Sequence, residues 1–122
     1  MSPTERRKAP RIEDEALSLE VKGGNLDIMT HTLNVSASGI YCKVEKEIPL
    51  MSRLQLMLMI PEAAKEGKPL TKMEVDGVVV RQHPVIIDGR IKHYDIAIFF
   101  ENLSPKNRET ISSYIARKKG QP

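Results

Sequence analysis

The sequence predicts a mainly β fold: a small six-stranded antiparallel β-barrel with a C-terminal α-helix and a flexible N-terminal arm. Three observations lead to this prediction. Six short segments between turn-forming residues are apolar at about every second position or more often, as strands with a buried face are. The segment after Ser104 changes to helical spacing, and residues 1–15 carry almost no apolar side chains. A chain of 122 residues fits one domain, which we place at residues 16–119, after the arm of residues 1–15.

The first two predicted strands form a hairpin. Leu17, Leu19 and Val21 alternate with polar residues, which indicates a strand with one buried face. Gly23-Gly24-Asn25 supplies the turn, and alternation resumes from Leu26 to about Val35.

The next two strands differ in how apolar they are. Turn formers at residues 34–39 lead into a short strand over residues 40–44. The strand over residues 54–60 is apolar on both faces, because Met57 and Met59 stand between its leucines. The two methionines indicate either a docking or dimer surface or burial beneath the C-terminal helix, so a homodimer stays an open alternative.

Two more strands and a helix complete the predicted fold. The strands cover residues 73–80 and 94–100, and Pro84 with Asp88-Gly89 marks the reversal between them. Ser104-Pro105 is a typical helix start, because the hydroxyl caps a free amide and proline lacks one. The helix carries one apolar stripe, formed by Ile111, Tyr114 and Ile115.

Composition excludes several classes of protein. The chain has no apolar run long enough to span a membrane and no signal peptide, so we expect a cytoplasmic location. The lone Cys42 excludes an internal disulfide and a Cys-rich zinc module. A net charge of +3 and only five aromatic residues argue against DNA or RNA as the partner. An RNA-binding barrel would rest on the basic charge alone.

Catalysis is not predicted. His31, His83 and His93 are far apart and show no metal-ligand spacing, and Cys42 lies within an alternating strand as a small buried residue. The chain has no glycine-rich phosphate loop, nucleophile elbow or paired carboxylates. We therefore expect neither an enzyme, nor a metal site, nor a cofactor.

Two arginines in the arm point to an anionic ligand. Pro10 favours an extended backbone at Ala9, so Arg7 and Arg11 stand along an extended stretch rather than on one helix face. The guanidinium group matches phosphate oxygens and the O6/N7 edge of guanine. On these residues alone, a solubilising basic terminus is the favoured interpretation.

A second motif follows at Asn34-Val35-Ser36-Ala37-Ser38-Gly39. Asn34 and Ser36 offer hydrogen-bond donors and acceptors, and Gly39 allows a close approach of the backbone. Taken alone, the motif is more typical of a turn without a ligand, because Asn, Ser and Gly favour turns for conformational reasons.

Together the two motifs resemble the PilZ domain, a bacterial family that binds the second messenger cyclic di-GMP. The family signature is Arg-x-x-x-Arg before the first barrel strand, followed by (Asp/Asn)-x-Ser-x-x-Gly. Residues 77–81, residues 94–100 and the C-terminal helix are similar to its later strands and its helix. Asn34 is a mild departure, since Asp is common at that position.

The resemblance implies a cyclic di-GMP site on one outer face of the barrel. Arg7 and Arg11 would contact phosphates and guanine, Asn34 and Ser36 would bind guanine, and Gly39 would hold the turn. These contacts are implied by the family motif.

Two further arginines extend the implied site. Arg6, directly before the motif, implies a stacked cyclic di-GMP dimer and thus two nucleotides per chain. Arg81 is a further candidate contact, with a solvated arginine at a strand end as the alternative.

The implied function is that of a receptor. Its arm would become ordered on ligand binding, and the altered surface would dock an as yet unknown protein partner. The alternative is a PilZ-like protein-interaction module that does not depend on a nucleotide.

Overall fold

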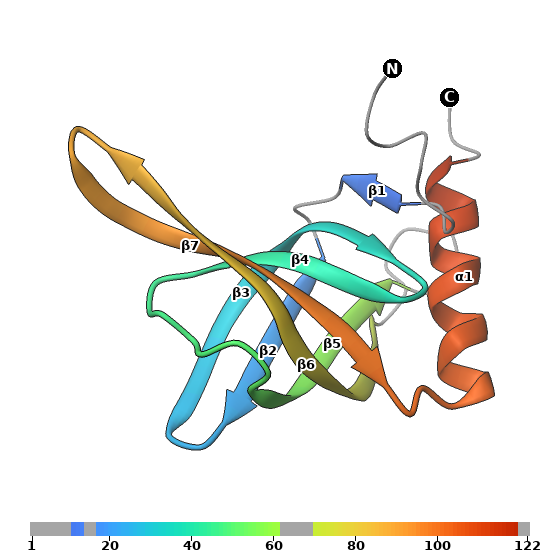
Figure 1. The fold of residues 1–122 in the computed structure, drawn as a ribbon. Helices are drawn as coiled ribbons and strands as arrows, with labels where there is room; N and C mark the ends of the chain where they lie inside the picture. Colours follow the sequence, from blue (N-terminus) through green and yellow to red (C-terminus); the bar gives the residue numbers. More distant parts are fainter. Residues whose placement is uncertain (1–10, 14–16, 62–69, 120–122) are drawn as a thin grey trace.

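The computed structural model describes residues 11–13, 17–61 and 70–119, which form seven strands and one helix (Figure 1). In chain order the elements are β1 (Arg11–Glu13), β2 (Ser18–Gly23), β3 (Leu26–Ser36), β4 (Gly39–Val44), β5 (Arg53–Pro61), β6 (Leu70–Ile87), β7 (Arg90–Glu101) and α1 (Pro105–Lys119).

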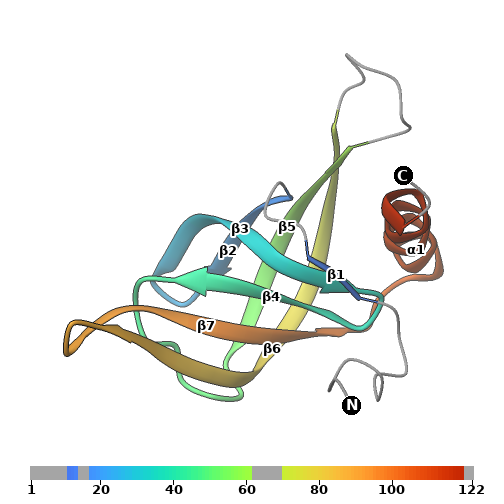
Figure 2. The same ribbon diagram turned by 90° about the horizontal axis from the view of Figure 1, so that it is seen from above.

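Six of the strands close into a barrel. The strand order is β3-β2-β5-β6-β7-β4, every neighbouring pair is antiparallel, and β4 returns to pair with β3 (Figures 1 and 2). Closure pairs both edges of the strands within the barrel, whereas the outer parts of β6 and β7 extend beyond these pairings. The predicted six-stranded antiparallel barrel is confirmed.

Alternation along the strands builds the core. Residues that pair across neighbouring strands turn to the same face of the sheet, and every second one is buried. Leu19, for example, pairs with Leu58, and neither side chain has any exposed surface. The core joins apolar side chains from β2 to β7 and from α1 in one cluster.

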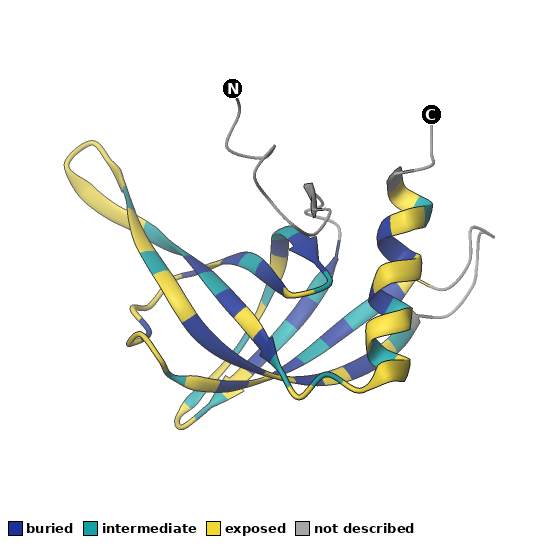
Figure 3. Cartoon of the chain, turned by 45° about the vertical axis from the view of Figure 1, so that its right-hand side comes forward, coloured by how far each residue is buried: buried dark blue, intermediate teal, exposed yellow. Residues whose placement is uncertain are grey.

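The C-terminal helix begins where the sequence predicts. The Ser104 hydroxyl accepts a hydrogen bond from the Asn107 amide at 3.1 Å, which satisfies one of the free donors of the first turn. The predicted stripe of Ile111, Tyr114 and Ile115 is buried in the core, while the opposite side of the helix is exposed (Figure 3).

Hydrogen bonds near both of its ends tie α1 to the barrel. Near its start, Asn107 Nδ2 donates to the Glu74 carbonyl oxygen at 3.3 Å, and near its end, Arg117 Nη2 donates to the Pro61 carbonyl oxygen at 2.8 Å. No helix within residues 11–13, 17–61 and 70–119 is long and apolar enough to cross a bilayer.

The β6–β7 hairpin is longer than the sequence predicts, and Pro84 does not mark a reversal. Pro84 lies inside β6, opposite Tyr94 of β7. Since β5 pairs with β6 only up to Val78, one edge of β6 is free at this point and tolerates a residue without an amide hydrogen. The chain reverses at Asp88-Gly89, where both residues have positive φ, as a tight hairpin turn requires.

The far part of this hairpin projects beyond the barrel (Figure 1). Its residues are largely exposed, including Ile86, Ile87 and Ile91. Met57 and Met59 of β5, by contrast, are half-buried and do not belong to the exposed apolar surface. The methionine pair therefore gives little support to a docking surface on β5.

Candidate functional site

The two sequence motifs lie side by side in the structure. Strand β1 pairs with the end of β3, with Arg11 opposite Ser36 and Glu13 opposite Asn34. Neighbouring strands are about 4.8 Å apart, so the backbone of the second motif arginine lies next to the Asn-x-Ser segment. The alternation pattern does not predict this short strand. Arg6 and Arg7 lie outside the described residues, and so does the side chain of Arg11.

The turn between β3 and β4 is fixed by Ser36. Its side chain is buried, and its Oγ accepts a hydrogen bond from the Ser38 amide at 3.2 Å and donates to the Gly39 carbonyl oxygen at 3.4 Å. Ser36 therefore shapes the turn in this structure. The Phe100 amide donates to the Ser38 carbonyl oxygen at 2.9 Å, which holds the turn against β7.

Gly39 is required by the close approach of β4 to β7. A Cβ atom at this position would overlap the carbonyl oxygen of Ile98, a backbone atom that has no rotamer with which to move away. The expected role of Gly39 in the turn thus has a steric basis.

A β-bulge directs Asn34 to the outer face. The register of β3 against β4 shifts between Thr32 and Asn34, so Asn34 pairs with Tyr41 while Val35 turns into the core. The Asn34 Oδ1 atom is buried without a hydrogen-bond partner in the described part of the chain. Such an unsatisfied acceptor costs about 1–3 kcal/mol, which a donor from a ligand or from the arm would offset.

A second bulge brings Arg81 into the same row. The register of β6 against β7 shifts between Val79 and Arg81, which places Arg81 opposite Ala97. Ala97 is opposite Tyr41, and Tyr41 is opposite Asn34. The outer face therefore carries the row Asn34, Tyr41, Ala97 and Arg81 across β3, β4, β7 and β6. Three strand spacings separate the ends of the row, roughly 14 Å, which a long arginine side chain can partly span.

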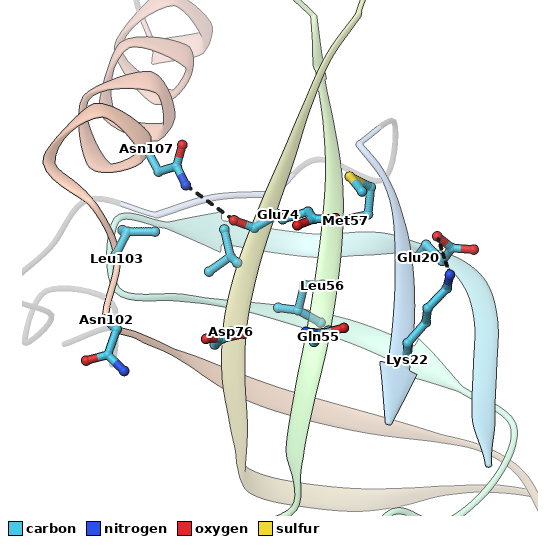
Figure 4. A pocket seen from close by; sticks show the side chains of 11 residues that line it. Glu20, Lys22, Gln55, Leu56, Met57, Glu74, Asp76, Asn102, Leu103 and Asn107 are labelled. Atoms are coloured by element: carbon cyan, nitrogen blue, oxygen red, sulfur yellow. Dashed lines mark hydrogen bonds and ion pairs between the residues drawn. The ribbon is translucent and has the colours of Figure 1, made fainter. Parts of the chain in front are cut away.

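A groove elsewhere on the barrel has a net negative lining, which is unfavourable for a ligand with negatively charged phosphates. It has a volume of about 270 Å³, and it lies between the outer faces of β2, β5 and β6 and the start of α1 (Figure 4). Glu20, Glu74 and Asp76 line it, and its one lysine, Lys22, lies 3.8 Å from Glu20. The carboxylates outnumber the cation, so this groove does not suit a phosphate ligand.

The structure shows where the histidine and cysteine side chains of the described strands lie. No group of three or more His, Cys, Asp or Glu side chains among the described residues could hold a metal ion. His93 Nε2 lies 3.1 Å from Asp95 Oδ1 on the surface of β7. The interpretation of Cys42 as a small buried residue is confirmed, because its side chain has no exposed surface.

Cys42 is expected to be unreactive in the folded protein. Burial, and to a lesser degree the charge of Asp95, raises the pKa of its thiol to about 12, so the nucleophilic thiolate is almost absent near pH 8. Iodoacetamide should leave the native protein unmodified and should alkylate it fully in guanidinium chloride, as intact mass would show. Rapid alkylation of the native protein would contradict the burial of Cys42.

Comparison with known proteins identifies the family. The sequence model of the PilZ domain matches residues 5–117, nearly the whole chain. The chain belongs to the PilZ domain family. The resemblance predicted from the two motifs is therefore confirmed. A search of curated protein sequences found no match.

Several solved structures share the fold of this chain. The inhibitor of motility MotI/DgrA of Bacillus subtilis superposes with a TM-score of 0.77 at 19% identity, over 98% of this chain and 56% of that one. YcgR of Escherichia coli in complex with cyclic di-GMP has a TM-score of 0.70 at 14% identity, over 93% and 46%. The present chain thus spans about half the length of these two proteins. The PilZ domain of YcgR with cyclic di-GMP matches over 93% of this chain and 96% of its own, with a TM-score of 0.65 and 17% identity.

The structure also reveals surface residues that the motifs do not contain. Tyr41, Ala97 and Phe99 lie on the outer face beside the motif residues. One signal for Phe99 was present in the sequence: since Ile98 and Phe100 alternate into the core, the ring between them must face outward. Its position next to the turn depends on the register of β4 and β7.

Proposed function

We propose that this PilZ domain is a cytoplasmic bacterial receptor for cyclic di-GMP and not an enzyme. The observation that carries the proposal is the register of β1 on β3, which sets Arg11 opposite Ser36, two residues along β3 from Asn34. Membership of the PilZ family supports it, as do the solved structures of YcgR in complex with cyclic di-GMP, which share this fold.

Each site residue has a chemical role in this proposal. Arg7 and Arg11 bind phosphate oxygens and the O6/N7 edge of guanine through their guanidinium groups. The unsatisfied Oδ1 of Asn34 accepts a hydrogen bond from guanine N1–H or N2–H. Ser36 and Gly39 keep the turn in the shape that presents this acceptor.

Arg6 and Arg81 contact a second nucleotide in this proposal. Arg6 extends the basic run of the arm, and Arg81 stands at the far end of the row that starts at Asn34. A stacked pair of cyclic di-GMP molecules carries four negative charges, so additional arginines on two sides of the site would stabilise it. Two nucleotides per chain are therefore proposed.

Signalling proceeds by ordering of the arm. Fixing six arm residues costs about 6–12 kcal/mol of backbone entropy, so two phosphate contacts at about 1.5–3 kcal/mol each do not suffice. Guanine contacts and base stacking add the remainder. The ordered arm changes the surface of the receptor, and a protein partner docks on the changed surface.

Isothermal titration with cyclic di-GMP tests the proposal. We expect binding in the micromolar range or tighter, with two nucleotides per chain for the stacked pair. Cyclic di-AMP is the matched control, because it keeps both phosphates but lacks guanine O6 and N2, and it should bind far more weakly. No heat from folded protein at tens of micromolar cyclic di-GMP would leave the nucleotide-independent interaction module as the better description.

A further inference from the structure

Phe99 is an exposed aromatic side chain beside the proposed site. It lies on β7 between the buried Ile98 and Phe100, and 51% of its surface is exposed. Val78 pairs with Phe99 from β6 and therefore turns to the same face, yet only 7% of its surface is exposed. The ring of Phe99 is thus accessible on a face where its immediate neighbour is covered.

The register places this ring at the edge of the Asn34–Gly39 turn. Phe99 is directly opposite Gly39, about 5 Å away between Cα atoms. The hydrogen bond from the Phe100 amide to the Ser38 carbonyl oxygen, 2.9 Å long, keeps β7 against the turn. Because Gly39 has no side chain, the residue of β4 directly opposite Phe99 does not cover the ring.

Two small residues, Gly39 and Ala97, form an open surface beside the ring, which we call the floor of the site. Gly39 is the cross-strand neighbour of Phe99, and Ala97 is the next residue of β7 on the same face. Around this floor stand Phe99, Tyr41, Asn34 and, across β3, the backbone of Arg11. Hydrogen-bonding groups thus lie on one side of the floor and an exposed ring on the other, an arrangement that suits a flat, polar-edged aromatic ligand such as a purine.

We propose that Phe99 is the stacking platform for one guanine base of cyclic di-GMP, with the polar edge of that base turned toward Asn34. The inference rests on the proposed function and adds a residue that neither sequence motif contains. Stacking of a base on an aromatic ring typically changes affinity by about 5- to 150-fold when the ring is removed.

Titration of Phe99→Ala and Phe99→Trp with cyclic di-GMP tests the platform. Phe99→Ala should weaken binding by about 5- to 150-fold. Ile91→Ala is the matched control, since Ile91 is 53% exposed but lies on the projecting hairpin. The affinity of this variant for cyclic di-GMP should equal that of the wild type. The chain contains no tryptophan, so Phe99→Trp introduces a single tryptophan, whose emission can be excited separately from that of the tyrosines. Its emission should be quenched on ligand binding while affinity is retained.

The outcomes separate this inference from the proposed function. If the wild-type protein binds cyclic di-GMP but Phe99→Ala binds equally well and the Phe99→Trp emission stays constant, the platform is disproved and the receptor function stands. If the folded wild-type protein does not bind, both fail. If Phe99→Ala does not fold, the fluorescence of Phe99→Trp decides: quenching that saturates with the ligand supports the platform, and its absence overturns it.

Discussion

Replacing Arg11 by alanine is expected to abolish cyclic di-GMP binding, with an increase in Kd of at least ~100-fold. The guanidinium group can make two charge-assisted hydrogen bonds of about 1.5–3 kcal/mol each, and about 1.4 kcal/mol corresponds to a factor of ten. The pairing of β1 with β3 uses backbone atoms, so Arg11→Ala retains it. Calorimetric titration should therefore show that binding is lost, while the midpoint of thermal unfolding should stay at the wild-type value. Arg7→Ala should behave in the same way.

Arg90→Ala is the control for the loss of charge. Arg90 is exposed at the end of the projecting hairpin. Its replacement by alanine removes one positive charge, as Arg11→Ala does. Its affinity for cyclic di-GMP should match that of the wild type. An equal loss of binding in Arg90→Ala would show that net charge, rather than the site, attracts the ligand. Unfolding of Arg11→Ala would show that this side chain is structural.

The fold was predictable because each barrel strand carries its own local signal. Alternation in Leu17, Leu19 and Val21 indicates a buried face whatever the strand pairs with, and Gly24, with a positive φ, marks its turn. Strand β1 has no such signal, since it is three residues long and is held by backbone pairing to β3. The sequence also does not predict the outer part of β6 and β7, because this part lies beyond the barrel and contains Pro84, which is typical of a turn.

The site was predictable only in part, for a related reason. The two motifs name Arg11, Asn34 and Ser36, and the register of β1 on β3 brings their backbones together. The relation of Arg81 to Asn34 depends on two bulges and on three strand pairings, none of which a single sequence shows. Phe99 could be assigned to the outer face from alternation, but not to the neighbourhood of Gly39.

Replacing Gly39 by alanine is expected to destabilise the barrel and to weaken ligand binding together. The new methyl group would overlap the Ile98 carbonyl oxygen, so β4 and β7 must separate or the turn must shift. Overpacking of this kind costs about 1–3 kcal/mol. Because the turn presents Asn34 and lies beside Phe99, a shift should also weaken cyclic di-GMP binding, by about tenfold or more. Chemical denaturation and calorimetric titration measure the two effects.

Gly24→Ala provides a control that matches the stability loss without touching the site. Gly24 lies in the β2–β3 turn, at the other end of β3, with a φ of 57° and open space around it. Alanine there is strained by about 1–2 kcal/mol through its backbone alone. If both variants lose stability but only Gly39→Ala loses affinity, the geometry of the Asn34–Gly39 turn determines binding. If both lose affinity equally, stability accounts for the effect, and the turn has no specific role in holding the ligand.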